Sequence, residues 1–543
     1  MTGSLASGDL AAADESGGAP APPPGPGGGD GRAAPAPPLL VAASAVIALL
    51  LFAPLVFLLI EAHGAGAGDI WHLIWRSLTG TLLWNTVRLT AVVTVLCAII
   101  GTLTAWCVER TDLPGRRVWA VLVVVPFAIP DFVVSFGWAS LTTWMHGFHG
   151  AVIVMTLAVY PLVYLPVAAS LRGADPGLEE TARSLGLGPV RTFFRVTVRH
   201  ARGAILGGCV LVALVILAEY GAFEILGYQT FTTEIFTEFS TFNVPTACAL
   251  SLVLVLLGAL VLGGDAAARG KGRMVRTGAF AQRAIRRHRL GRGTIPVLAG
   301  FTLLAGLALG VPVGSSFYWM VTEQTQAFTG VSIIDAGWHT AVYSGVAAAL
   351  ATALALPVAL LAVRHRGRPG RLLERGTYLV MAVPGLVIAL AISYFSVKYA
   401  HSFGFQTAPL LIVAYVILFF PLALVGVRAS VAHAPVTLEE VARSLGSRRP
   451  AVFGRVTLPL IGPGLAASFC LVFLAAVTEL TATLVLVPPG VQTLATQFWQ
   501  YQTNLAYGQA APFALVIIAI AAVPSYLIGR YFDRRPTRAA NPA

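Results

Sequence analysis

Leu178–Gly186 reads LEETARSLG, and Leu438–Gly446 reads LEEVARSLG. The two stretches lie 260 positions apart (438 − 178 = 260), and they keep agreeing as far as Thr197 and Thr457, through a shared Phe and a shared Arg-Val-Thr. Internal repetition of this kind marks a duplicated structural unit. The 543-residue chain is therefore predicted to consist of two halves built to one design.

Each stretch predicts a short amphipathic helix. In the first, Leu178, Ala182 and Leu185 recur at positions i, i+4 and i+7 and form one apolar stripe. Glu179 and Arg183 stand four residues apart, a spacing that favours an ion pair on a helix. The second copy repeats the pattern with Leu438, Glu439, Ala442, Arg443 and Leu445.

The sequence also predicts where these helices begin and end. Gly186 and Gly446 are well placed to end their helix in a left-handed turn. Thr437 and Glu440 fit a capping box in the second copy, whereas the first copy has Gly177, a weaker cap. The alternative interpretation is a helix that lies on lipid. That role gives no reason to keep Glu, Ala, Gly and the distal Phe in register.

Composition places the repeated stretches in a membrane protein. Hydrophobic residues make up 57% of the chain and charged residues only 11%, against about 25% charge in a soluble protein. The apolar residues form twelve blocks, each long enough to cross a hydrocarbon layer of about 30 Å as a helix. The blocks run over 38–61, 85–108, 118–142, 150–171, 204–227, 246–264, 294–320, 338–363, 376–399, 408–430, 464–487 and 510–531. We therefore predict an all-α integral membrane protein.

The formal net charge of +12 is distributed loop by loop. With the amino terminus inside, the predicted inner loops hold the arginine clusters, and the predicted outer loops are almost free of Lys and Arg apart from Arg76. By the positive-inside rule both termini are expected to be cytoplasmic. Nucleic-acid binding is not favoured, because the charge is not gathered on one domain.

Six blocks precede a basic linker and six follow it, so the halves have the same orientation and form a parallel repeat. The predicted organisation is a disordered cytoplasmic tail over 1–37, a first half over 38–264 with its repeated loop at 173–203, a basic linker over 265–293, a second half over 294–532 with its repeated loop at 431–463, and a cytoplasmic tail over 533–543. The five cysteines all fall within predicted helices and are expected to be free thiols.

The repeated loop resembles the EAA loop of binding-protein-dependent ABC transporter permeases, roughly E-A-A-x3-G followed after a spacer by Leu-Pro. The matching residues are Glu180, Ala182 and Gly186 in the first copy, and Glu440, Ala442, Gly446, Leu458 and Pro459 in the second. Both copies depart from the pattern at its middle position, with Thr181 and Val441 in place of Ala, and the first copy lacks the Leu-Pro.

The resemblance implies a fold and a set of partners. In such permeases this loop is a coupling helix that docks on a cytoplasmic ATPase, so two copies of the loop imply two ATPase subunits. An extracytoplasmic substrate-binding protein and membrane lipid would complete the assembly, in the plasma or inner membrane of a bacterium. The residues expected to couple are Glu179, Glu180, Ala182, Leu185, Gly186, Glu439, Glu440, Ala442, Leu445 and Gly446.

The sequence contains no G-x4-G-K-[ST] phosphate-binding loop. The chain is therefore expected to be a permease and not an enzyme, with no bound cofactor or stably bound metal of its own. ATP and magnesium would be used by the partner ATPase.

Three stretches resemble the ferric iron (Fbp/Sfu-type) group of fused permeases. They are LPGRRVWAVLVVVPFAIPDFVVSFGW from Leu113, AEYGAFEILGYQTFTTEIFTEF from Ala218, and ELTATLVLVPPGVQTLATQFW from Glu479. The resemblance spans the chain after about residue 40 and implies ferric iron as the substrate.

Acidic residues within apolar segments are costly and therefore candidates for function. Glu219 and Glu479 fall in the fifth predicted helix of each half, again 260 positions apart (479 − 219 = 260). Carboxylate and phenolate oxygens suit Fe³⁺. We therefore expect this pair to line the pathway, with Asp131, Tyr220 and Glu224 as weaker candidates. The alternative is that the two glutamates cap or hydrogen-bond within the helix bundle.

Two other functions remain open. The same kind of permease could carry thiamine, phosphonate or a polyamine. A secondary transporter of twelve helices, driven by an ion gradient, also has six-plus-six parallel repeats, although two near-identical cytoplasmic loops count against it.

Overall fold

The computed structural model describes residues 37–64, 75–174, 177–269, 287–323, 330–365, 380–399 and 406–533, together with the single residues 68, 370, 376 and 377. Within these ranges the backbone is helical, and the only β-type pairing is an isolated bridge between Thr111 and His288. Nearly all of the predicted tail 1–37, most of the predicted linker and nearly all of the predicted tail 533–543 lie outside the described residues.

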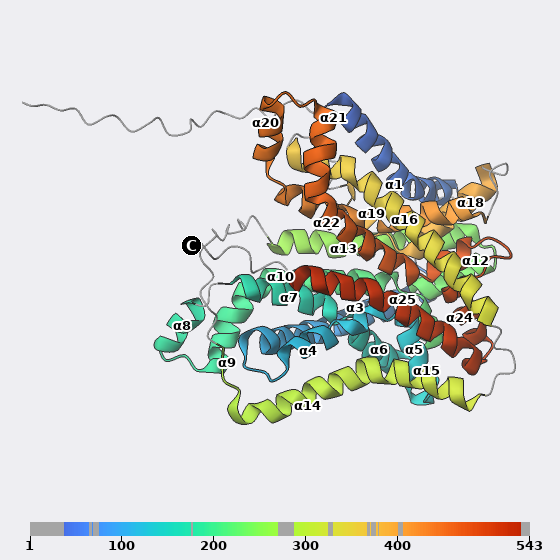
Figure 1. Ribbon diagram of the computed structural model, residues 1–543. Helices are drawn as coiled ribbons and strands as arrows, with labels where there is room; N and C mark the ends of the chain where they lie inside the picture. Colours follow the sequence, from blue (N-terminus) through green and yellow to red (C-terminus); the bar gives the residue numbers. More distant parts are fainter. Residues whose placement is uncertain are drawn as a thin grey trace, which may run out of the picture. The chain divides into compact units, whose positions relative to one another are not determined.

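The first half of the sequence forms the helices drawn from blue to light green in Figure 1. Their bounds are α1 Pro38–Gly64, α3 Ser77–Arg110, α4 Arg116–Leu122, η1 Val125–Ala128, α5 Asp131–Ala139, η2 Thr143–Met145, α6 Phe148–Val159, α7 Pro161–Gly173, α8 Gly177–Ser184, α9 Pro189–Thr192, η3 Phe193–Thr197, α10 Val198–Ala218, α11 Gly221–Ile225, α12 Phe231–Ser240 and α13 Val244–Arg269.

The second half repeats this order of long and short helices. Their bounds are η4 Gly291–Gly293, α14 Thr294–Ala305, η5 Gly306–Gly310, α15 Val311–Thr322, α16 Gly330–Arg364, α18 Gly385–Tyr399, α19 Ala408–His433, α20 Val436–Ser444, α21 Arg449–Val452, η7 Phe453–Thr457, α22 Leu458–Val477, α23 Thr481–Leu486, α24 Leu494–Thr503 and α25 Tyr507–Asp533.

Most of the twelve predicted segments correspond to helices of membrane-spanning length. Among the described residues nine helical runs are long and apolar enough to cross a membrane, and a tenth is counted if a bent pair forms one span. Two further predicted segments contain the shorter apolar helices Gly385–Tyr399 and Tyr507–Val523. The chain is thus an all-α membrane protein.

The bent pair is the predicted segment 118–142. Its helical parts, Arg116–Ala128 and Asp131–Ala139, meet at 90°. The break falls at Ile129 and Pro130, where the backbone is extended before α5 begins. Proline lacks an N–H and disfavours a helical residue before it, which explains the break at Pro130.

The first helix of each half packs against the other half. Helix α1 contacts α13, α16 and α18, with Phe57 packed edge-on against Phe395 at 5.9 Å and Lys398 Nζ 2.6 Å from Glu61 Oε1. Helix α15 packs on α5 and α25. A Cβ at Gly137 would come within 2.6 Å of Pro312 Cα, so this crossing requires a glycine.

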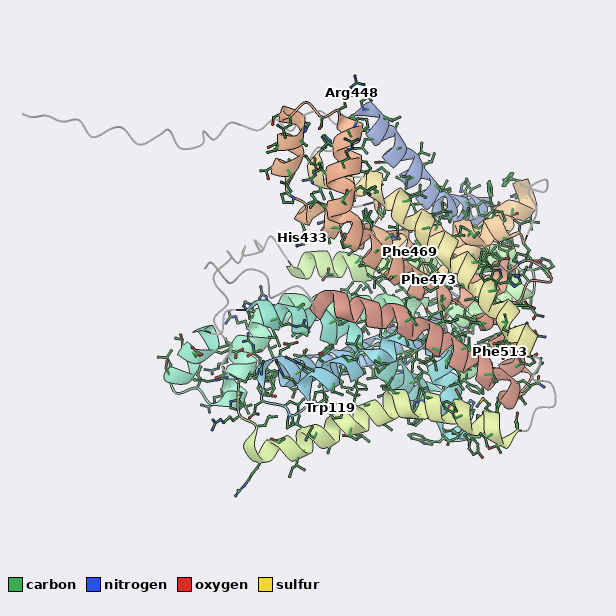
Figure 2. All side chains as sticks on the ribbon, viewed as in Figure 1. Trp119, His433, Arg448, Phe469, Phe473 and Phe513 are labelled. Carbon is green, nitrogen blue, oxygen red and sulfur yellow. The ribbon has the colours of Figure 1, made fainter. Side chains whose placement is uncertain are left out.

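The hydrophobic cores combine the two halves in the same way. One core gathers the buried residues of α16, α18, α19 and α22 around parts of α1, α12 and α13. The other gathers α3, α5, α6, α7 and α10 around α14, α24 and α25. In Figure 2 Trp119 of α4 faces α14, and its ring lies 5.5 Å from that of Phe301. Each half of the sequence thus depends on the other for its packing.

Candidate functional site

Helices α8 and α20 hold the repeated stretches and lie at the same end of the long helices, opposite α12 and α24 (Figure 1). Both end as predicted, with φ of +82° at Gly186 and +85° at Gly446. Leu187 N–H donates to the Ala182 carbonyl and Ser447 N–H to the Ala442 carbonyl, each at 3.1 Å. This is a Schellman ending, in which glycine avoids the steric cost of a left-handed residue.

The first glutamate of each Glu-Glu pair, Glu179 or Glu439, holds its short helix against the rest of the protein. The Glu179 side chain is 10% exposed; its carboxylate lies 3.5 Å from Arg110 Nε and accepts a hydrogen bond from the Thr197 hydroxyl at 3.0 Å. In the second half Arg364 Nη2 donates to Glu439 Oε1 at 2.8 Å. Each arginine also donates to the backbone carbonyl where the loop begins, that of Ala174 or Ala434.

These anchors join each short helix to the end of a long one. Arg110 is the last residue of α3 and Arg364 the last of α16. Sequence reasoning missed both arginines. The two arginines lie 254 positions apart (364 − 110 = 254), which differs from the 260 positions between the repeated loops, so the repeat did not reveal them.

The second glutamate and the last leucine face outward. Glu180 and Glu440 are exposed, and Leu185 and Leu445 are 78% and 79% exposed. Ala182, by contrast, is buried. The predicted apolar stripe is therefore not a single buried face, because its leucine points away from the chain while its alanine packs.

Two predicted details of these helices have different outcomes. The capping box at Thr437 is wrong: α20 begins at Val436, and its N-cap is Pro435, which makes no side-chain cap hydrogen bond. The ion pair between Glu179 and Arg183 is present at 3.7 Å. In the second half Arg443 Nε donates instead to the backbone carbonyl of Glu439, and the Glu439 carboxylate pairs with Arg364.

The distal part of the repeat forms a π-helical turn in both halves, Phe193–Thr197 and Phe453–Thr457. Thr197 and Thr457 are buried at the end of this turn. Thr197 reaches back to the anchoring glutamate of its own half, so the matched Phe and Thr serve the packing of the loop. Beyond α20, Arg448 projects at the tip of the loop in Figure 2.

Glu219 and Glu479 do not lie within a helix, as the sequence had suggested. They occupy the break after α10 and the break after α22, and short helices follow at Gly221 and Thr481. Glu219 Oε1 accepts the N–H of Ala222 at 2.8 Å, and Glu479 Oε1 accepts the N–H of Ala482 at 2.9 Å. The alternative of capping within the bundle is thus realised at both positions.

Both glutamates nevertheless keep part of their surface accessible among buried neighbours. Each is half-buried, whereas Tyr220 and Leu480, which follow them in sequence, are 2% and 3% exposed. A threonine hydroxyl binds each glutamate's backbone carbonyl, Thr232 at 2.6 Å and Thr483 at 2.7 Å. These buried threonines, which the sequence analysis missed, fix the backbone at each break.

The two halves meet at this point. A Cβ at Gly221 would come within 2.7 Å of the Leu480 side chain and 3.1 Å of Phe132 Cβ. Asp131 and Glu479 both lie within electrostatic reach of Glu219. The two glutamates and the half-buried Asp131 at the start of α5 thus lie where the halves meet, and their role in a substrate pathway stays a prediction.

The site is not symmetric at Asp131. The equivalent position, at the start of α18, is Gly385, where a Cβ would lie 3.3 Å from Glu479 Oε1. Of the weaker candidates, Tyr220 is packed among rings, 4.5 Å from Phe236 and 5.7 Å from Trp499. Glu224 is exposed on α11. The described residues contain no group of three or more His, Cys, Asp or Glu side chains arranged to hold a metal ion.

Comparisons with known proteins show the family to which the chain belongs. The family described as binding-protein-dependent transport system inner membrane component matches residues 97–265 and 345–538. An Fe(3+)-transport system permease protein of Haemophilus influenzae is 37% identical over 489 residues, which cover 89% of this chain and 96% of that protein. A ferric transport system permease protein of Actinobacillus pleuropneumoniae is 22% identical over 80% of this chain and 69% of its own length.

A more distant relative aligns with a smaller part of the chain. The sulfate transport system permease protein of Salmonella typhimurium is 26% identical over 238 residues, 40% of this chain and 86% of its own. The family model matches twice, once in each half, and the ferric relative aligns with nearly the whole chain. The chain therefore belongs to the binding-protein-dependent transport system inner membrane component family, as a fused two-half ABC transporter permease of the ferric iron type.

Proposed function

We propose that this permease imports ferric iron, which an extracytoplasmic binding protein delivers and which two cytoplasmic ATPase subunits drive across the membrane. The observation that carries the substrate is the carboxylate site between the halves. Asp131, Glu219 and Glu479 would repel an anion and attract a cation, and their oxygens suit a hard cation such as Fe³⁺. The ferric relatives support the same substrate.

The accessible surfaces of α8 and α20 support the ATPase partners. An exposed leucine at the tip of each helix, beside an exposed glutamate, offers an apolar contact with a charged rim. Through Arg110 and Arg364, movement of each docked helix would move α3 or α16 with it. Rocking of the two halves would then open the carboxylate site to one side of the membrane and afterwards to the other. ATP and magnesium would be bound by the ATPase subunits.

Uptake of radioactive ferric iron tests the substrate. The permease and its ATPase are reconstituted in liposomes, with ATP on the side of the ATPase and the iron-loaded binding protein on the other side. We expect ATP-dependent uptake of iron, no competition by sulfate, thiamine or phosphonate, and an ATPase subunit that co-purifies with this chain. Uptake driven by an ion gradient without ATP would instead favour a secondary transporter.

Orientation is tested by cysteine labelling. In a chain whose five native cysteines have been replaced, Ser184→Cys and Ser444→Cys place one exposed thiol at each repeated loop. We expect a membrane-impermeant maleimide to label neither in intact spheroplasts and both in inside-out vesicles. Leu505→Cys, exposed at the opposite end, is the matched control and should show the reverse. Labelling of either loop from outside would contradict both the topology and the coupling role.

A further inference from the structure

Two bulky residues adopt a backbone conformation that favours glycine. Among the described residues, only three residues other than glycine have a positive φ: Phe242 at 60°, Gln406 at 54° and Leu505 at 59°. In this region the Cβ of an L-residue is crowded by its own backbone. Phe242 and Leu505 therefore adopt a backbone conformation that is sterically unfavourable for their side chains.

The two residues occupy equivalent places in the two halves. Helices α12 and α24 both open with a threonine capping box, at Thr230 and Thr493, and 242 − 230 equals 505 − 493. Both helices close in a Schellman ending. Phe242 N–H donates to the Phe239 carbonyl at 3.0 Å, and Leu505 N–H donates to the Gln502 carbonyl at 3.1 Å.

The coupling helices use the expected residue at the same place in this motif. Gly186 and Gly446 hold the left-handed position there, as is usual for a Schellman ending. The apolar contact that commonly accompanies such an ending is made by the next residue and not by the left-handed one. The phenyl ring and the leucine side chain are thus not needed to end α12 and α24.

Both side chains point away from the protein. Phe242 is 87% exposed and Leu505 is 69% exposed. Their exposed neighbours are polar: Ser240, Thr241, Asn243, Thr503 and Asn504. Hydroxyl and amide groups are costly to place in hydrocarbon, so these tips face water. An apolar side chain with a polar rim is typical of a protein contact.

The tips lie on the side opposite the coupling loops. Phe242 and Leu505 immediately precede α13 and α25, whose other ends lead to the basic linker and the basic carboxyl-terminal residues. Helices of 26 and 27 residues span about 39–40 Å at 1.5 Å per residue. Figure 1 likewise shows α12 and α24 at the end opposite α8 and α20.

We propose that Phe242 and Leu505 are a matched pair of anchors for the extracytoplasmic binding protein, one on each half. This proposal rests on the proposed function, because it requires a delivery protein on the outer side. The family to which the chain belongs is described as binding-protein-dependent. A partner that binds both tips at once would bind with an affinity that depends on the relative position of the two halves. The carboxylate site between the halves depends on the same relative position.

Glycine substitution tests the pair without threatening the fold. Phe242→Gly and Leu505→Gly remove the side chains and relieve the backbone, so thermal stability should be unchanged or raised. The permease–ATPase complex is placed in lipid nanodiscs and titrated with its purified, iron-loaded binding protein. We expect each variant to need about tenfold more binding protein for half-maximal ATPase stimulation, and the double variant to need more still. ATPase activity without binding protein should not change.

Gln406→Gly is the matched control, since it relieves a third left-handed residue in a predicted outer loop without removing an exposed apolar side chain. It should leave the titration as in the wild type. A double glycine variant that responds at the wild-type concentration of binding protein would overturn the proposal. A double variant that binds normally but inserts poorly or melts earlier would also overturn it, in favour of lipid anchoring. If the wild type itself does not respond to iron-loaded binding protein, the proposed function fails first.

Discussion

Arg364→Met is expected to uncouple ATP hydrolysis from transport while the chain still inserts into the membrane. Arg364 ends α16 and donates to Glu439 at 2.8 Å and to the Ala434 carbonyl at 3.1 Å. Arg364 therefore links the end of α16 to α20. Methionine keeps the apolar part of the side chain and removes both hydrogen bonds, so α20 would be free to move without moving α16.

The size of the effect follows from the geometry. The side chains of Arg364 and Glu439 are 13% and 17% exposed, so their contact is only partly screened by water. A hydrogen bond to a charged group contributes about 1.5–3 kcal/mol, which corresponds to a roughly ten- to hundredfold loss of the anchored population. Uptake per ATP hydrolysed should fall by a similar factor in proteoliposomes.

Arg110→Met provides the comparison within the same molecule. Glu179 keeps its hydrogen bond from Thr197 and its contact with Arg183 when Arg110 is lost, and the distance from Arg110 to Glu179 is already 3.5 Å. We therefore expect uptake per ATP hydrolysed to fall less in Arg110→Met than in Arg364→Met. Glu440→Gln, which leaves the anchor intact, should change the affinity for the ATPase and not the ratio of uptake to hydrolysis. Equal coupling ratios in Arg364→Met and the wild type would contradict the anchoring role.

The short helices of the repeated loops could be predicted from the sequence because their information is local. Helix spacing and a glycine at the left-handed position are contained in nine consecutive residues, and both halves repeat them. The anchoring arginines could not be found in this way, because Arg364 and Glu439 are 75 residues apart in the chain. Their pairing depends on how α16 packs beside the loop, and no periodicity reports it.

The breaks at Glu219 and Glu479 were missed for a different reason. The segment 204–227 is apolar over most of its length and has no proline, so it looks like one continuous helix. The break brings Gly221 closer to Leu480 and Phe132 than any side chain permits, and this tertiary contact cannot be predicted from local sequence. The glutamate then caps the helix that restarts. Likewise, the exchange of α1 and α15 between the halves could not be read from segment order, which does not specify lateral neighbours.

The double variant Glu219→Gln/Glu479→Gln is expected to lose most ferric iron uptake without losing its fold. Glutamine is nearly the same size, and its Oε1 can still accept the N–H of Ala222 or Ala482. The caps of α11 and α23 are thereby kept, and only the charge is removed. An interaction with a charged group contributes about 1.5–3 kcal/mol, so each lost charge should lower uptake roughly ten- to hundredfold.

Because glutamine can still cap the short helices but carries no charge, the capping role and the cation-binding role of these residues can be tested separately. If the glutamates serve only to cap the short helices, glutamine should sustain wild-type uptake, whereas Glu219→Ala and Glu479→Ala should lower thermal stability. If their charge meets the cation, glutamine should lower uptake at unchanged stability, and Asp131→Asn should add to the loss, because Asp131 acts on the same site. Glu224→Gln, exposed on α11, should have a much smaller effect. Full uptake in the double glutamine variant, with normal insertion, would mean that iron crosses the membrane without meeting these carboxylates.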